Sequence, residues 1–135
     1  MSAPMLRLAG PVLDAAHPLE RVRFYERLLG WPIVRSEGPR PGRPPVDGWA
    51  LSRSPDGSQK IEIRWEPSYF APTWAPVAGE HLMMIPLDFG VDDLEAGAVW
   101  APDDGARLAD HQPQEHVRVM LDPESHPLRL FLDER

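Results

Sequence analysis

The segment from residue 18 to residue 29 carries the clearest helical pattern in the chain. Its apolar positions recur at intervals of three and four residues, and charged residues, including Arg21, occupy most of the positions between them. The apolar positions are Leu19, Val22, Tyr25, Leu28 and Leu29. Pro18 suits a first helical turn, and Gly30 suits the residue after a helix. The pattern therefore predicts one amphipathic helix over 18–29 that packs its apolar face on a sheet.

Strand patterns lie on both sides of this helix. Short apolar or alternating segments predict strands at 5–13, 31–36, 48–53 and 60–66. The segment 38–45 contains too many prolines and glycines for regular structure and is predicted to be a loop. A proline-rich stretch at 67–79 then separates the first half of the chain from the second.

The second half has a similar order of elements. The long apolar run 81–91 predicts a mostly buried strand, in which Pro86 causes a bulge or lies at an edge. Asp92 or Asp93 can cap a second helix that contains Leu94 and Ala98. Three further short strands are predicted, with a turn at 122–125 before the last one. They span 106–110, 116–121 and 127–132.

The order strand, helix, three strands thus occurs twice. Leu19 and Leu94 begin the two helical patterns 75 positions apart. The predicted fold class is α+β: two βαβββ modules, at about 5–66 and 80–133, joined at 67–79 within a single domain spanning 1–135. Two like modules can pack their sheets edge to edge as a curved mixed sheet around a concave cleft, which is a natural place for a small molecule.

Composition narrows the range of functions. The chain has a formal net charge of −7 and no cysteine. Its basic residues form no stripe that could neutralise a nucleic-acid backbone, and cysteine-based catalysis and thiolate metal sites are excluded. Neither a signal peptide nor an apolar run long enough to cross a membrane is visible. We therefore expect a cytoplasmic protein without a nucleic-acid or membrane partner.

Several motifs, taken in order, resemble one family. They are Phe24-Tyr-Glu-Arg-Leu-Leu-Gly-Trp31, Val91-Asp-Asp-Leu-Glu95, Gly105-Ala-Arg107 and Asp122-Pro-Glu-Ser-His-Pro-Leu128. Together they resemble the vicinal oxygen chelate superfamily, which includes glyoxalase I, extradiol dioxygenases, fosfomycin-resistance proteins and bleomycin-binding proteins. Within it, the glyoxalase-like branch is the most similar. The resemblance covers nearly the whole chain and implies the fold of two βαβββ modules already predicted from the pattern.

The resemblance also implies four positions where metal-dependent members carry His, Glu or Gln ligands. In this chain those positions fall on Gly10 or Pro11, on Arg64, on Pro86 and on Arg129. Glycine and proline side chains offer no donor atom, and a guanidinium is a cation without an acceptor. We therefore expect no cofactor and a lost metal site. A partial site rebuilt from Glu62 and His81 is the alternative.

The candidate ligand-binding residues are two arginines and three tryptophans. Arg64 and Arg129 could hold an anionic group by bidentate hydrogen bonds if both point into the cleft. Aromatic walls from Trp49, Trp65 and Trp74 would suit a flat ligand, although each could instead belong to the core.

Three functions remain open. The preferred one is a metal-free protein that binds a small aromatic or anionic molecule in its cleft. The alternatives are a metal-dependent lyase, isomerase or dioxygenase with displaced ligands, and a metal-independent enzyme or partner subunit. The resemblance also implies a homodimer whose clefts are completed by modules of both chains.

Overall fold

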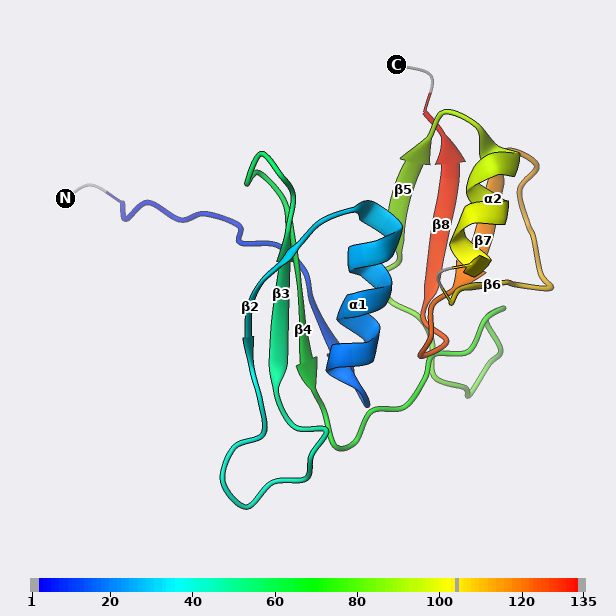
Figure 1. The fold of residues 1–135 in the computed structure, drawn as a ribbon. Helices are drawn as coiled ribbons and strands as arrows, with labels where there is room; N and C mark the ends of the chain where they lie inside the picture. The colour runs from blue at the N-terminus through cyan, green and yellow to red at the C-terminus, as the bar shows by residue number, and fades with distance from the viewer. Residues whose placement is uncertain (1–2, 104, 134–135) are drawn as a thin grey trace.

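The computed structural model describes residues 3–103 and 105–133, which form two βαβββ modules (Figure 1). The first module consists of β1 (Val12–Ala15), α1 (Pro18–Leu29), β2 (Ile33–Glu37), β3 (Trp49–Arg53) and β4 (Lys60–Trp65). The second consists of β5 (Leu87–Val91), α2 (Leu94–Asp103), β6 (Arg107–Leu108), β7 (Val117–Leu121) and β8 (Pro127–Leu132). No helix among the described residues is long and apolar enough to cross a bilayer.

The two modules share one sheet topology. The strand order is β1-β4-β3-β2 in the first sheet and β5-β8-β7-β6 in the second, so the first strand of each module lies beside the last. This first-to-last pair is parallel in both sheets, and the remaining pairs are antiparallel. The predicted α+β class and the repeated plan are therefore confirmed.

Helix α1 begins and ends where the sequence predicts. Pro18 occupies the first turn, and the N–H of Gly30 donates to the carbonyl of Glu26 at 2.8 Å. Gly30 has a φ of 71°, a left-handed conformation that glycine adopts without steric cost. At the second helix, Oδ1 of Asp93 accepts the N–H of Ala96 at 3.0 Å, so Asp93 is the capping residue of the two candidates.

The buried face of α1 is wider than its apolar stripe predicts. Val22 and Tyr25 are fully buried as expected, but so is Phe24, whereas Leu19 is 45% exposed. Arg21, placed on the charged face by the sequence pattern, is 1% exposed. The reason is that α1 packs on the first sheet and also contacts the second module, where the Tyr25 and Phe89 rings stack with centroids 6.2 Å apart.

Two predicted strands are shorter than expected. The segment 5–13 forms a strand only from Val12, and Met5, Leu6 and Leu8 are each more than 85% exposed. The run 81–91 forms a strand only from Leu87, after Pro86. In both cases the excluded residues lie outside the ladder of the sheet, and Leu82 instead forms an isolated bridge with Thr73. An apolar run alone does not satisfy backbone hydrogen bonds.

One hydrophobic core joins the two modules. Buried residues of α1, the first sheet and the second sheet form a single cluster, and Figure 1 shows α1 between the two sheets. Each sheet therefore turns one face toward this core. We call the opposite faces the outer face of sheet one, which carries Asp14 and Arg64, and the outer face of sheet two, which carries Asp88 and Arg129.

Candidate functional site

A cavity of about 410 Å³ lies at one end of the first sheet. Its walls come from β3, β4, the end of β2 and the connection between β2 and β3. The lining residues are Glu37, Gly38, Arg40, Asp47, Gly48, Trp49, Glu62, Arg64 and Trp65. Three of the predicted ligand-binding residues, Trp49, Arg64 and Trp65, therefore border one cavity, which we call the sheet-one cavity.

The loop wall of this cavity is held by one ion pair. Arg40 donates from Nε and Nη2 to the two carboxylate oxygens of Asp47 at 2.9 and 2.8 Å, and its backbone N–H donates to Oδ2 at 2.8 Å. These hydrogen bonds lower the pKa of Asp47 to about 2. Gly48 follows with a φ of 141°, and a Cβ there would collide with the carbonyl oxygen of Glu37. The proline-rich loop is thus irregular, as predicted, but firmly anchored.

Trp49 forms the aromatic wall and is oriented by two neighbours. Its Nε1–H donates to Glu37 Oε2 at 3.0 Å, and the Arg35 guanidinium lies 5.5 Å from the ring centroid. A cation at this distance from a tryptophan ring is attracted by the negative face of the π system. The ring is therefore fixed by β2 while it borders the sheet-one cavity.

The charges on β4 differ in their partners. Arg64 Nε donates to Asp14 Oδ1 of the neighbouring strand at 2.8 Å, and this bond raises the pKa of Arg64. Glu62 lies two residues earlier on the same face, and its carboxylate has no hydrogen bond or ion pair with any described residue. Arg64 thus already has a hydrogen-bonded carboxylate partner, and Glu62 acts on it only through its charge.

The same cross-strand pair occurs in the second module. Arg129 donates from Nε and Nη2 to Asp88 at 2.6 and 2.8 Å, and Asp88 and Arg129 are direct neighbours on β5 and β8, as Asp14 and Arg64 are on β1 and β4. The hydrogen bonds to Asp88 raise the pKa of Arg129. Asp14 and Asp88 lie 74 positions apart, so the repeat extends to a specific ion pair that the sequence analysis did not identify.

The structure separates the remaining candidates. Arg129 lies on the other sheet and does not line the sheet-one cavity. Trp74 lies in the joint, where its Nε1–H donates to the carbonyl of His111 at 3.1 Å and its ring tilts against the His111 ring. Within one chain, neither Arg129 nor Trp74 therefore borders the cavity that Trp49 lines.

The donor set at the outer faces does not fit the family's metal ion. Two of its carboxylates, Asp14 and Asp88, are bound to guanidiniums, and a divalent ion would have to displace those cations. No group of three or more His, Cys, Asp or Glu side chains suited to a metal occurs among the described residues. Glu62 and His81, the fallback ligands, line different cavities.

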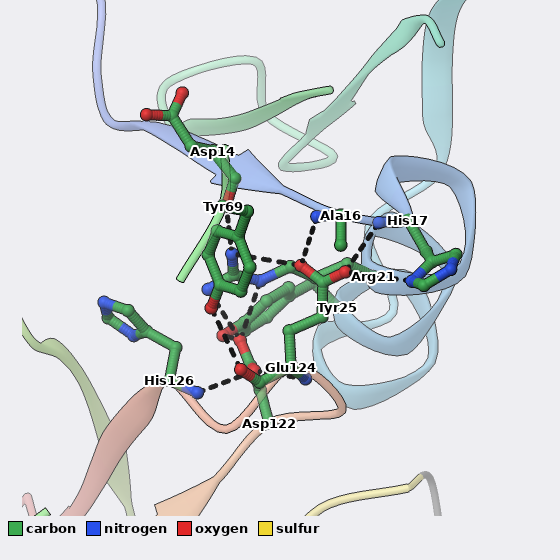
Figure 2. Close-up of polar contacts among 9 residues, drawn as sticks. All are labelled: Asp14, Ala16, His17, Arg21, Tyr25, Tyr69, Asp122, Glu124 and His126. Atoms are coloured by element: carbon green, nitrogen blue, oxygen red, sulfur yellow. Dashed lines mark hydrogen bonds and ion pairs between the residues drawn. The ribbon is translucent and has the colours of Figure 1, made fainter. Parts of the chain in front are cut away.

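A second polar cluster lies where α1 meets the second module (Figure 2). Asp122, fully buried after β7, accepts the Arg21 Nε–H and the Tyr25 hydroxyl, each at 2.8 Å. Its other oxygen accepts the N–H groups of Glu124 and His126 at 2.9 and 3.1 Å. Burial is the largest single effect on Arg21 and lowers its pKa, but the surrounding groups, Asp122 first among them, together outweigh it and the pKa is raised. Burial raises the pKa of Tyr25 well above its usual value.

Glu124 extends this cluster to the start of α1. Its carboxylate accepts the N–H groups of Ala16 and His17 at 3.1 and 2.6 Å, and its carbonyl accepts the Tyr69 hydroxyl at 2.9 Å. Burial raises the pKa of Tyr69 to about 12. Burial and the nearby Arg21 lower the pKa of His126. The cluster ties the two modules together and was missed because its members are about 100 residues apart.

The chain belongs to the glyoxalase-like domain family, whose family model matches residues 11–131. The resemblance to the vicinal oxygen chelate superfamily is thereby confirmed. A comparison with curated proteins finds no match.

Solved structures share the fold at low sequence identity. A glyoxalase family protein from Enterococcus faecalis is 22% identical with a TM-score of 0.63, and the alignment covers 93% of this chain and 96% of that one. The fosfomycin resistance protein FosX from Listeria monocytogenes, complexed with Mn(II) and sulfate, is 12% identical with a TM-score of 0.67, covering 96% and 94%. At these identities the likeness concerns the fold alone.

Proposed function

We propose that this protein binds a small aromatic molecule in the sheet-one cavity and does so without the family's metal ion. The observation that carries the proposal is the cavity of about 410 Å³ with Trp49 fixed in its wall. Concave sites with an aromatic wall and a few polar groups are typical of small-molecule binding. The lack of suitable donors at the family's ligand positions supports the metal-free part.

Of the two ligand types expected from the sequence, the aromatic one has more support. Arg64 and Arg129 were the basis for an anionic ligand, yet each already binds an aspartate. An anion would have to replace a carboxylate that is held on the neighbouring strand. Arg64 and Arg129 stay candidate binding residues. A ligand would contact each of them together with its aspartate partner, not as a free cation.

A homodimer would bring the two outer faces together. Because both sheets turn their inner faces to one shared core, Arg64 and Arg129 lie on faces directed away from it. An outer face of sheet two from a second chain could close the sheet-one cavity. Exposed apolar side chains beside the edge strand β1 support such an interface. They are Val12, Phe70, Leu82, Met84 and Ile85.

Two measurements test this proposal: the metal content of the purified protein and its molecular mass in solution. Elemental analysis of the purified protein, before and after dialysis against Mn, Fe, Ni and Zn, should find no stoichiometric ion, and the melting temperature should not rise with any of them. One tightly held ion per chain with a matching rise would refute the metal-free function. Light scattering should give twice the 15.2 kDa chain mass, whereas a monomer would refute the shared cleft.

A further inference from the structure

We propose that the sheet-one cavity selects aromatic ligands that carry a cationic nitrogen group, such as an amidine, with Glu62 as the residue that recognises the cation. This inference rests on the proposed function, because it names the ligand class of the same cavity. Its basis is the distribution of charges around the cavity wall.

The cavity wall has more carboxylates than available cations. Its charged lining residues are Glu37, Asp47 and Glu62 against Arg40 and Arg64. Arg40 is bound to Asp47 through two side-chain hydrogen bonds, and Arg64 is bound to Asp14 outside the lining set. Both guanidiniums of the lining therefore already have a carboxylate partner, whereas the Glu62 carboxylate has no hydrogen-bonded partner among the described residues.

Glu62 is the carboxylate with unused acceptors. The Glu37 carboxylate accepts the indole N–H of Trp49, whereas the Glu62 carboxylate accepts no hydrogen bond from a described residue. Glu62 is half-buried, so a hydrogen-bond donor of the ligand would reach a carboxylate that is partly shielded from water. A charge-assisted hydrogen bond from N–H groups satisfies such a carboxylate better than any neutral or anionic group does.

The register of the sheet sets Glu62 and Trp49 at a distance that suits one ligand. Trp49 pairs with Arg64 and Leu51 pairs with Glu62, so Trp49 and Glu62 are diagonal neighbours on the same face. Diagonal neighbours lie about 7–8 Å apart. An aromatic ring that packs against Trp49 can therefore direct a short substituent of that ring toward Glu62.

Trp49 itself favours a cationic ligand over an anionic one. Its ring already attracts the Arg35 guanidinium, and the negative faces of an indole repel an anion placed over them. An amidinium is planar like a guanidinium, so it can stack as well as donate two parallel hydrogen bonds to a carboxylate.

Three probes of one shape but different charge test the inference. Benzamidine, benzamide and benzoate are titrated into the intact protein by calorimetry at neutral pH. We expect benzamidine to bind at least about tenfold more tightly than benzamide, the scale of one charge-assisted hydrogen bond, and benzoate to bind most weakly. Glu62→Gln should reduce the benzamidine affinity to that of benzamide, while Glu115→Gln, in an exposed loop, should leave it unchanged.

The outcomes separate the two proposals. If all three probes bind equally and Trp49→Leu abolishes binding, the cavity is a ligand site without charge selection, and only this inference fails. A benzamidine affinity that survives Glu62→Gln also refutes it, provided that the variant melts at the wild-type temperature. If none of the probes binds, both this inference and the proposed function are refuted.

Discussion

Removal of the Asp122 carboxylate should destabilise the protein more than any other single charge change. Asp122 is fully buried and accepts hydrogen bonds from Arg21, Tyr25 and two backbone N–H groups. In Asp122→Ala, Arg21 remains buried, and its partners are the carbonyl of Asp14 at 2.6 Å, the Glu124 carboxylate at 3.7 Å and the Tyr69 ring, whose centroid lies 5.9 Å from the guanidinium. An uncompensated charge in such a place is energetically costly.

The expected size follows from this geometry. Breaking a buried ion pair by removing one partner costs about 3–5 kcal/mol, against a total free energy of unfolding of about 5–15 kcal/mol. At about 2.1 cal/mol/K per residue, a chain of 135 residues has an unfolding entropy of about 280 cal/mol/K. The melting temperature should therefore fall by about 11–18 °C.

Urea denaturation measures this effect, and the second module offers a matched control. Asp88→Ala breaks an Asp–Arg pair of the same chemistry whose side chains are 44% and 37% exposed, so it should cost less than about 1 kcal/mol. Combining Arg21→Met with Asp122→Ala removes the stranded cation and should recover part of the loss. A cost below about 1 kcal/mol for Asp122→Ala, or equal costs for the two aspartates, would refute the reasoning.

Three further predictions concern stability. Burial lowers the pKa of His126 in the folded state, so below about pH 6.5 the unfolded chain binds more protons than the folded one. The free energy of unfolding should therefore decrease as the pH falls from about 6.5 toward the folded pKa. Urea denaturation of His126→Gln at several pH values should lack this decrease. Phe24→Ala should cost about 3–5 kcal/mol and Leu19→Ala much less, the reverse of what the helical stripe indicates; a thermal melt giving Leu19 the larger effect would contradict the packing. Arg64→Ala should change the free energy of unfolding by less than about 1 kcal/mol, because its pair with Asp14 is exposed; a larger loss in urea would show that the pair is structural.

Local signals were enough to predict the elements with two clear ends. Pro18 and Gly30 delimit α1 correctly because helix capping depends on residues within one turn. The repeat of strand, helix and three strands was also readable, since each βαβββ module has its own hydrophobic pattern. The family resemblance carried by the Phe24–Trp31 motif and its counterparts is confirmed over residues 11–131.

Strand length was decided by partners that the local sequence does not reveal. The apolar run 81–91 predicts a long buried strand, but pairing with β8 begins at Leu87. Leu82 and Ile85 are instead at least 50% exposed. A strand extends only as far as a neighbouring backbone satisfies its N–H and C=O groups, and that neighbour is 41 residues away in sequence.

The charged side chains depended most on the tertiary structure. Sequence alone placed Arg21 on a solvated face, because helical periodicity describes one packing surface and α1 has two. It identified Arg64 and Arg129 but not the aspartates that neutralise them, which lie 50 and 41 residues away. The sequence determined which charges the protein has, and the meeting of distant strands decided which of them remain without a partner, because an ion pair depends on distance in space and not along the chain.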